Sequence, residues 1–346
     1  MSEPARSDRD RGLVLVTGAT GFTGGHLARV LRNRGYRVRA LVRPSTDGSG
    51  LERDGVEVVT GDITNRDDVV HAARDVDAIY HLAALYRTAG HPDRVYREVN
   101  VYGTRHVLEA ADRQSVRRVV HCSTIGVHGA ITEVPSNEES PFNPGDIYQE
   151  TKLEGELLAQ EAFSNGLSGS IVRPTGIYGP GDLRFLKLFR SVRSGRFFMV
   201  GSGEVYYHLS HIDDLVQGFL LCGEEPAAIG NVYIIGSEEY QTLNEFVARV
   251  AAAVGVDPPR RHVPLWPVMA AAVACERICT PLRINPPLHK RRVEFFVKPR
   301  AFSVEKAKRE LGFTPRVPLD EGLRRTAAWY VQEGLLPPPP GDGRGA

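Results

Sequence analysis

A tyrosine and a lysine four positions apart, Tyr148 and Lys152, are the residues of this sequence best suited to move a proton. Residues 148–163 have the composition of a helix, and side chains four apart on a helix lie on one face. A free phenol with a pKa near ~10 exchanges protons poorly at neutral pH, whereas a nearby ammonium group lowers that pKa. The spacing predicts a tyrosine acid/base that exchanges a proton with a substrate hydroxyl or carbonyl. The alternative is an exposed helix with a solvated lysine.

Two hydroxyl residues, Ser123 and Thr124, directly follow the apolar run Arg118–Cys122. This run is predicted to be a strand, and groups at the carboxyl end of a parallel strand face the crevice in which ligands bind. The pair therefore predicts a hydroxyl close to the reacting atoms. The alternatives are a helix cap and a serine/threonine turn.

Three evenly spaced glycines, Gly18, Gly21 and Gly24, lie between an apolar run at residues 13–16 and a predicted helix at residues 26–34. Unpaired N–H groups and the dipole at a helix start favour an anion there. Glycines also allow a pyrophosphate to approach the backbone, since a Cβ would block it. The pattern G-x-x-G-x-x-G therefore predicts a dinucleotide site. A tight strand-to-helix turn without a ligand is the alternative.

Alternating strands and helices position these groups. The sequence pattern predicts strands at residues 13–16, 36–42, 56–59, 78–82, 118–122 and 169–173, and a further strand at 232–235. Helices are predicted at residues 26–34, 67–74, 96–112, 148–163 and 243–254. Strands that alternate with helices at this spacing imply right-handed crossovers, and therefore an α/β fold with a doubly wound parallel sheet.

The chain is predicted to have two main parts. Residues 13–175 form the dinucleotide-binding part, which includes the helix of Tyr148 and Lys152. Residues 176–335 form mostly a smaller substrate-binding lobe, because loops rich in glycine and proline follow residue 173. Residues 1–12 are expected to be a disordered leader and residues 336–346 a disordered tail, since their compositions are polar or rich in proline and glycine.

Composition argues against several other functions. The formal net charge of +1 gives no basic excess for nucleic acid. No apolar run reaches the ~20 residues that span a bilayer, and residues 1–12 lack the apolar core of a signal peptide, so a cytoplasmic location is expected. The four scattered cysteines form no zinc-binding pattern. His211, Asp213 and Asp214 are interpreted as a helix start rather than metal ligands, and no metal is expected.

These motifs together resemble the extended short-chain dehydrogenase/reductase family, with its NAD-dependent epimerase/dehydratase and 3β-hydroxysteroid dehydrogenase-like branch. The resemblance extends from about Leu13 to Trp329. It rests on residues 17–24 (TGATGFTG), 61–62 (GD), 81–84 (HLAA), 100–104 (NVYGT), 123–124 (ST), 148–152 (YQETK) and 173–176 (RPTG). It implies a Rossmann-type fold and an oxidoreductase that transfers a hydride between the nicotinamide of NAD(P) and a secondary alcohol or ketone.

The resemblance also implies roles for individual residues. Tyr148 is expected to be the general acid/base, Lys152 to hold the nicotinamide ribose and lower the tyrosine pKa, and Thr124 to hydrogen-bond the reacting oxygen. The turn around the pyrophosphate is expected to comprise Gly18, Thr20, Gly21, Phe22, Thr23 and Gly24. The other expected cofactor residues are Asp62 and Ile63 along the adenine, Leu82, Ala83 and Ala84 behind the pyrophosphate, Asn100 supporting the fourth strand, and Pro174 beside the nicotinamide.

The end of the second predicted strand bears on the choice of cofactor. A carboxylate there would bind the ribose hydroxyls and repel the 2′-phosphate of NADP, but the sequence has Arg43 and Pro44. Because a guanidinium can hold a phosphate through two hydrogen bonds, NADP is favoured over NAD. Alternatively, Arg43 stacks on the adenine or is solvated, and Asp47 folds back towards the ribose.

Three positions bear on the substrate. Sugar-nucleotide members of the family usually carry an asparagine where Gly176 stands and an arginine where Tyr207 stands, and both changes weaken a grip on a diphosphate. Arg184 either faces an anionic substrate or lies on a solvated helix face. A small-molecule substrate of the 3β-hydroxysteroid dehydrogenase-like kind is favoured. The alternatives are a sugar-nucleotide epimerase or dehydratase that retains its NAD, and a non-catalytic cofactor-sensing protein.

Two surfaces are predicted to meet other molecules. Residues 264–282 are apolar but interrupted. They either form a buried helix of the second lobe, cap an apolar substrate, or touch a membrane surface without spanning it. The family resemblance also implies a homodimer, formed through helices like those at residues 96–112 and 148–163.

Overall fold

A computed structural model describes residues 11–87, 91–279 and 293–339. Residues 1–10 of the predicted leader and residues 340–346 of the predicted tail lie outside these residues. The first residues of the predicted tail pack against the protein: Leu336 is buried, and Arg193 donates a 2.7 Å hydrogen bond to the carbonyl of Pro338.

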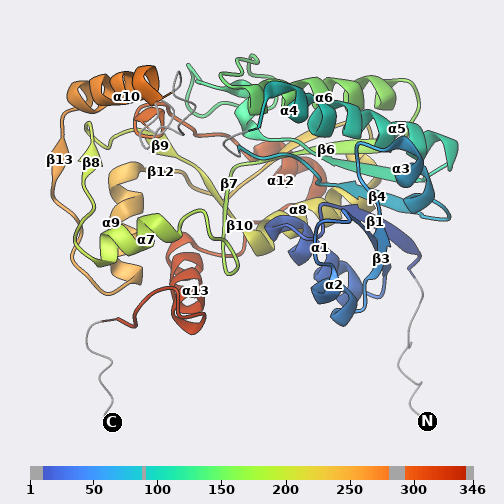
Figure 1. The fold of residues 1–346 in the computed structure, drawn as a ribbon, viewed down its shortest axis with the longest axis horizontal. Coiled ribbons are helices and arrows are strands. Elements are labelled where there is room, and N and C mark those ends of the chain that lie inside the picture. The colour runs from blue at the N-terminus through green and yellow to red at the C-terminus, as the bar shows by residue number, and fades with distance from the viewer. Residues whose placement is uncertain (1–10, 88–90, 280–292, 340–346) are drawn as a thin grey trace, which may run out of the picture.

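A seven-stranded parallel sheet with the order β11-β6-β5-β4-β1-β2-β3 forms the centre of the fold (Figure 1). Its strands are β1 (Leu13–Thr17), β2 (Arg37–Val42), β3 (Glu57–Thr60), β4 (Ala78–His81), β5 (Arg118–Cys122), β6 (Gly169–Pro174) and β11 (Val232–Ile235). Val14 and Val16 of β1 pack into one core, and Leu13 and Leu15 into the core on the opposite face. This double burial explains the continuous apolar run and confirms the predicted doubly wound sheet.

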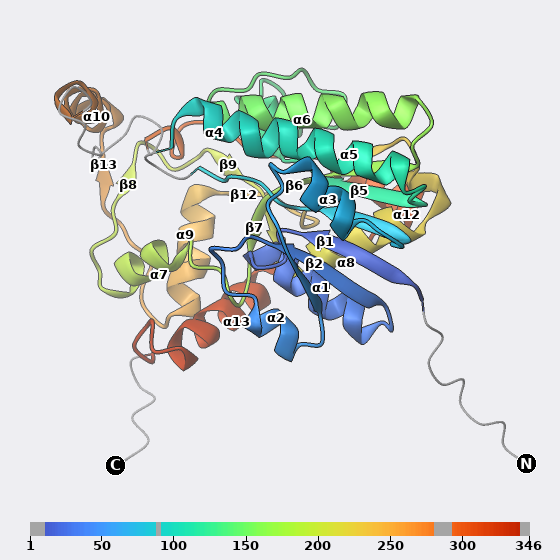
Figure 2. The ribbon, with the colours of Figure 1, turned by 45° about the vertical axis from the view of Figure 1, so that its right-hand side comes forward.

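Helices cover both faces of the sheet. One core contains residues of α1 (Phe22–Asn33), α8 (Ile212–Glu224) and α12 (Glu305–Leu311). The core on the other face contains residues of α3 (Arg66–Ala72), α5 (Gly103–Arg113) and α6 (Ile147–Ser164). Figure 2 shows α5 and α6 lying side by side along that face. The short helix α2 (Ser49–Arg53) follows β2.

The predicted helix at residues 96–112 is not a regular α-helix. It consists of α4 (Asp93–Arg97), a π-helical turn at Glu98–Tyr102 and α5. Such turns insert an extra residue into the helix and are frequent at functional sites. Here the π-helical turn carries Asn100, whose side chain is buried.

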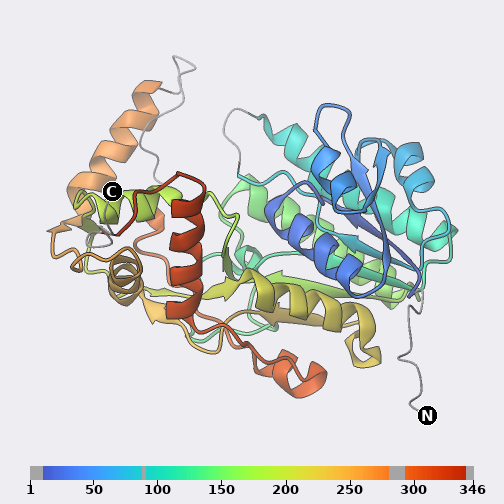
Figure 3. The same ribbon diagram turned by 90° about the horizontal axis from the view of Figure 1, so that it is seen from below.

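The second lobe has a core of its own beside the carboxyl ends of the sheet strands (Figure 3). Its helices are α7 (Leu186–Arg193), α9 (Leu243–Ala253), α10 (Leu265–Cys279) and α13 (Leu319–Gln332). Three short strand pairs join it: β7 (Gly176–Tyr178) with β10 (Leu209–His211), β9 (Tyr206–Tyr207) with β12 (Gln241–Thr242), and β8 (Met199–Val200) with β13 (His262–Val263). Helices α8 and α12 pack on the central sheet, and β11 is one of its strands. The chain after residue 176 therefore contributes to the dinucleotide-binding part as well as to the second lobe.

The apolar helix α10 lies on the surface, contrary to the prediction of a buried helix for this segment. Ala272 is its buried residue, whereas Trp266 is 76% exposed and Ile278 63% exposed. Residues 280–282 of the predicted segment lie outside the described residues. In the part of the chain that the structure describes, no helix is long and apolar enough to cross a membrane. Contact with a membrane surface or with a substrate stays a prediction.

Candidate active site

The glycine turn joins β1 to α1 at the centre of the sheet. Gly18 has a φ of +76°, and a Cβ there would lie 2.8 Å from the amide nitrogen of Ala83. A Cβ on Gly24 would lie 2.2 Å from the carbonyl oxygen of Gly18. The turn therefore needs these glycines because it packs against its own backbone and against the loop after β4. No side chain caps the start of α1, so its first N–H groups are open to an anion.

A cavity of about 480 Å³ lies beside this turn, between the sheet and the second lobe. It brings together most of the predicted site residues. Those that line it are Gly18, Gly21, Phe22, Thr23, Gly24, Leu82, Ala84, Thr124, Tyr148, Lys152, Pro174, Gly176, Arg184 and Tyr207. Thr20 lines an adjoining groove, whereas Arg43, Asp62, Ile63, Ala83 and Asn100 line neither space.

Tyr148 lies in the first turn of α6, which begins after Asp146, where the Asp146 carboxylate accepts a 3.0 Å hydrogen bond from the amide of Gln149. One turn later, Lys152 donates a 2.6 Å hydrogen bond from Nζ to the carbonyl oxygen of Cys122 at the end of β5. Thr124 caps a short 3-10 turn and also hydrogen-bonds the Tyr148 hydroxyl. The cap, which is the alternative interpretation of this residue, is therefore present, and the expected hydrogen bond from Thr124 to the reacting oxygen stays a prediction.

The acidity of Tyr148 differs from the prediction. Burial raises the pKa of its phenol well above the ordinary value, and the nearby Tyr86 raises it further. The spacing predicts that Lys152 lowers the pKa of Tyr148. In the structure the cation that lowers it is Arg87, whose guanidinium carbon lies 5.5 Å from the centre of the tyrosine ring. Burial also lowers the pKa of Lys152. The phenol is therefore protonated at neutral pH.

A chain of buried hydrogen bonds links the glycine turn to α6. Thr17 Oγ1 lies 2.8 Å from His81 Nδ1, and His81 Nε2 lies 3.0 Å from Thr104 Oγ1. The Thr104 hydroxyl donates to the carbonyl of Asn100, so it accepts from His81 Nε2–H. His81 Nδ1 therefore accepts from the Thr17 hydroxyl, and this fixes the tautomer. Burial lowers the pKa of His81 to about 3, so the ring is neutral.

Asn100 continues this chain to α6 and to the loop after β4. Its amide nitrogen donates a 3.0 Å hydrogen bond to Oγ1 of Thr151, the residue before Lys152. Its Oδ1 accepts a 2.7 Å bond from the amide of Leu85, and its amide nitrogen also donates to the Leu85 carbonyl. Asn100 thus holds the loop of Ala83 and Ala84 without lining the cavity. Thr17, His81 and Thr104 belong to the sequence motifs, but their spacing alone does not indicate that they touch.

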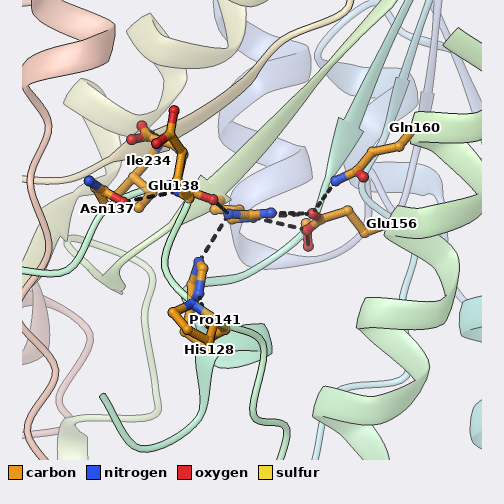
Figure 4. Close-up of polar contacts among 10 residues, drawn as sticks. His128, Asn137, Glu138, Pro141, Glu156, Gln160 and Ile234 are labelled. Atoms are coloured by element: carbon orange, nitrogen blue, oxygen red, sulfur yellow. Dashed lines mark hydrogen bonds and ion pairs between the residues drawn. The ribbon is translucent and has the colours of Figure 1, made fainter. Parts of the chain in front are cut away.

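A network of polar and charged groups surrounds Glu156 (Figure 4), and Ser123 of the hydroxyl pair takes part in it. Arg173 of β6 and Glu156 of α6 form an ion pair whose side chains are 1% and 0% exposed. Ser123 donates to the same carboxylate, as does Gln160 at 2.9 Å. The Arg173 guanidinium also donates to the carbonyl of Glu138 and to His128 Nε2. Ser123 is therefore committed to this network, and Thr124 alone of the pair reaches the tyrosine.

The residues expected at the adenosine end are arranged differently. The Asp62 carboxylate accepts hydrogen bonds from the amide and hydroxyl of Thr64, and Ile63 is buried in a core. Arg43 is exposed after β2. Asp47 lines the groove beside Thr20 and accepts hydrogen bonds from Ser49, which lower the pKa of its carboxyl. Asp47 therefore lies beside the glycine turn, although it follows the end of β2 by five residues in the sequence.

Two further arginines, Arg87 and Arg300, line the cavity and were missed by the sequence motifs. Arg87 follows the HLAA motif by three residues, which is a weak local signal. Arg300 has no such signal, because strand β9 and the chain around residue 300 meet only in the fold, through a bridge between Tyr207 and Arg300. Arg184, predicted near the substrate, is bound by the Asp182 carboxylate at 2.7 Å.

A metal site finds no support among residues 11–87, 91–279 and 293–339, which contain no cluster of metal-ligating side chains. All four cysteines are free thiols. His211 caps α8 by accepting from the amide of Asp213, and Asp213 and Asp214 lie in the first turn, so the predicted helix start is confirmed.

Comparison with known proteins identifies the family of this chain. The sequence model of the NAD dependent epimerase/dehydratase family matches residues 14–236. The chain is 32% identical to a 2-alkyl-3-oxoalkanoate reductase of Stenotrophomonas maltophilia, over 91% of this chain and 98% of the relative. It is also 32% identical to a 3-beta-hydroxysteroid dehydrogenase of Mycolicibacterium neoaurum, over 93% and 92% of the two chains.

A solved structure shows the same fold with a cofactor. MoeE5 in complex with UDP-glucuronic acid and NAD superposes with a TM-score of 0.73 at 28% identity, covering 93% of this chain and 100% of the other. The uncapped start of α1 and the close-packed glycine turn fit a dinucleotide, since they offer N–H groups to a pyrophosphate and exclude side chains there. This chain is thus a nicotinamide-dependent enzyme that belongs to the NAD dependent epimerase/dehydratase family, within the extended short-chain dehydrogenases/reductases.

Proposed function

We propose that the protein transfers a hydride between the nicotinamide of NAD(P) and a secondary alcohol or ketone, as a 3β-hydroxysteroid dehydrogenase-like oxidoreductase. The observation that carries this proposal is that Thr124, Tyr148 and Lys152 line the same cavity as the glycine turn. A bound nicotinamide would supply or accept the hydride. The relatives are named for different substrates, an oxoalkanoate in one case and a hydroxysteroid in another. Their names therefore support the type of reaction more strongly than any one substrate.

Within this proposal, each residue has a distinct task. Tyr148 gives its proton to a ketone oxygen in reduction and takes it back in oxidation, and the high pKa of the buried phenol suits the donor role. Thr124 holds the tyrosine hydroxyl and orients the reacting oxygen. Lys152, fixed by the Cys122 carbonyl, offers its remaining hydrogens to the nicotinamide ribose.

The test is steady-state turnover with a panel of secondary alcohols and ketones, followed by the absorbance of the reduced nicotinamide. We expect Tyr148→Phe to lower kcat/KM by about 10²- to 10⁴-fold, since this is the usual contribution of a general acid/base. The dissociation constant for the cofactor should change by less than about threefold. Tyr80→Phe is a matched control, because Tyr80 is a buried tyrosine on β4 of the central sheet that does not line the cavity.

The second candidate, a sugar-nucleotide epimerase or dehydratase, is favoured by one observation, the arginines at the cavity. Gly176 and Tyr207 line the same cavity and argue against a diphosphate grip. An enzyme of that kind would keep its NAD through native purification and show no net change in reduced cofactor. A cofactor-sensing protein would be unaffected by Tyr148→Phe. Either result would replace the proposal.

The choice between NADP and NAD remains part of the proposal. Arg43 supports NADP, because an exposed guanidinium follows β2. Asp47 supports NAD, because its carboxylate lines the groove beside Thr20. A homodimer through α4, α5 and α6 is also proposed. Tyr102, at the end of the π-helical turn between α4 and α5, is 48% exposed, and Leu157 of α6 is 45% exposed, so large apolar side chains face outwards there and support a dimer.

A further inference from the structure

The substrate side of the cavity contains guanidinium nitrogens without partners. Arg87 and Arg300 both line the cavity that contains Tyr148. Arg300 Nη1 and Arg87 Nε are buried from solvent and have no hydrogen-bond partner within the part of the chain that the structure describes. Buried donors are nearly always hydrogen-bonded, so such groups in a ligand cavity point to a ligand that accepts from them.

The charge of Arg300 has no direct ion-pair partner among the described residues, and Glu294, which attracts it from farther away, is paired with Lys298 at 2.9 Å. Its guanidinium lies over aromatic rings, 6.0 Å from the centre of Tyr207 and 5.9 Å from that of Phe295. Among residues 11–87, 91–279 and 293–339, no carboxylate lies within ion-pair distance of it. Burial lowers the pKa of Arg300 and the positive charge of Arg87 lowers it further, although Tyr207, Tyr86 and Glu294 act in the opposite direction. An anion between the two arginines would relieve both effects.

Arg87 places this anion close to the reaction. Its guanidinium carbon lies 5.5 Å from the ring centre of Tyr148, and one of its nitrogens lies 3.1 Å from the Asp146 carboxylate. Asp146 therefore offsets the charge of Arg87, and the charge of Arg300 remains. Arg184, in contrast, is bound by the Asp182 carboxylate and donates to the carbonyl of Ile177, so it offers less to a ligand.

We propose that Arg300, assisted by Arg87, binds a carboxylate of the substrate, so that the enzyme acts on hydroxy or oxo acids. The carboxylate lies a few bonds from the reacting carbon, because Arg87 contacts the face of Tyr148. One uncompensated cation suits one negative charge, and the planar guanidinium suits the two oxygens of a carboxylate. The apolar remainder of the substrate packs on Ile125, Phe185 and Phe302, which line the same cavity.

This inference rests on the proposed hydride transfer and is tested with a matched pair of substrates, a 3-hydroxyalkanoate and its methyl ester. We expect Arg300→Met to lower kcat/KM for the acid by about 30- to 100-fold, the usual effect of losing a charged hydrogen bond. Turnover of the ester should change by less than about threefold. Arg300→Lys should restore part of the activity on the acid. Equal losses on acid and ester would overturn the proposal.

A binding measurement separates this inference from the proposed reaction. Calorimetry with the NAD(P)-loaded protein compares decanoate with decanamide, neither of which reacts. If wild type binds decanoate more tightly and Arg300→Met removes this preference, the carboxylate site stands even where no alcohol is turned over. Equal binding of the two ligands would overturn it. Binding of UDP-glucose that depends on Arg300 would also overturn it, in favour of a diphosphate.

Two controls show whether the variants report on this site. The exposed Arg196→Met should leave both substrates unaffected, since its side chain lies outside the cavity. The melting temperature of Arg300→Met should stay near that of wild type. Methionine is unbranched and uncharged and can still pack against the rings of Tyr207 and Phe295, so the variant tests the charge rather than folding.

Discussion

The two sides of the cleft satisfy their buried polar groups in opposite ways. On the cofactor side, a continuous chain of hydrogen bonds runs from Thr17 through His81 to Thr104 and Asn100, and then to α6. On the substrate side, Arg87 Nε and Arg300 Nη1 are buried without such partners among the described residues. The first side is complete before a ligand binds, and the second gains its partners from the ligand.

This difference has a physical meaning. A hydroxyl or imidazole that is bonded within the protein keeps one orientation, so the loop after β4 and the start of α6 are fixed before the cofactor arrives. A guanidinium with unused donors gives more binding energy to a ligand that can accept from them. The cofactor site is therefore preorganised, and substrate choice depends on a few unpaired groups.

The largest expected effect tests the most deeply buried part of the preorganised side. Glu156→Gln leaves the charge of Arg173 buried without its partner, so we expect the free energy of unfolding to fall by about 3–5 kcal/mol. Urea unfolding followed by circular dichroism measures this loss. Ser123 also loses its charged acceptor, so the loop that carries Thr124 should become less ordered.

Glu154→Gln is the matched control on the same helix. Glu154 pairs with Arg97, but the two side chains are 40% and 42% exposed. An exposed pair contributes about 0–1 kcal/mol, so this variant should unfold almost as wild type does. Similar losses for the two variants would mean that burial of the Glu156 pair has no special importance.

The second effect is a dependence of the free energy of unfolding on pH, and it comes from His81. Its pKa is lowered to about 3 in the folded protein by burial, below the ~6.5 of an unfolded histidine. Between these two pKa values the unfolded state binds one more proton than the folded state. The contribution of the neutral His81 to the free energy of unfolding is therefore fully present above pH ~6.5 and is lost as the pH falls towards 3. Compared with His81→Leu, wild type should lose up to about 1.4 kcal/mol more per pH unit.

Denaturant unfolding at several pH values between neutrality and the onset of acid unfolding measures this slope. His208 and His211, whose pKa values are lowered to about 4 by burial, add the same trend to both proteins and cancel in the comparison. Identical slopes for wild type and His81→Leu would show that His81 does not titrate as its burial requires.

A neighbouring histidine is the exception on the preorganised side. His121 of β5 stands beside His81 in the sheet, with ring centres 5.3 Å apart, but neither of its ring nitrogens has a partner in the described structure. Replacing a buried, unpartnered polar group by an apolar one removes its desolvation penalty. We expect His121→Leu to raise the free energy of unfolding by about 1–2 kcal/mol. A loss of stability in urea unfolding would contradict this.

The fold and the place of Tyr148 and Lys152 at the cavity could be predicted because their signals are local. Apolar runs marked the strands buried on both faces, and the spacing of Tyr148 and Lys152 placed both on one face of α6, at the cavity. The contacts of His81 with Thr17 and Thr104 join separate segments, so no spacing reveals them. Arg300 reaches the cavity only through the packing of the second lobe. The raised pKa of Tyr148 likewise follows from burial, which a sequence does not show.

The smallest expected effect concerns the adenosine end, where the sequence left the cofactor open. Arg43 is exposed, so a contact with the 2′-phosphate of NADP should contribute no more than a surface ion pair. We expect Arg43→Ala to weaken NADP binding by about fivefold and to leave NAD binding unchanged.

Asp47→Asn should leave NADP binding unchanged or improve it, because a carboxylate repels the phosphate. If calorimetry instead shows that Asp47→Asn weakens NAD and Arg43→Ala changes neither cofactor, then Asp47 selects NAD. The adenosine end would then be preorganised like the rest of the cofactor side, since Ser49 already holds the Asp47 carboxylate.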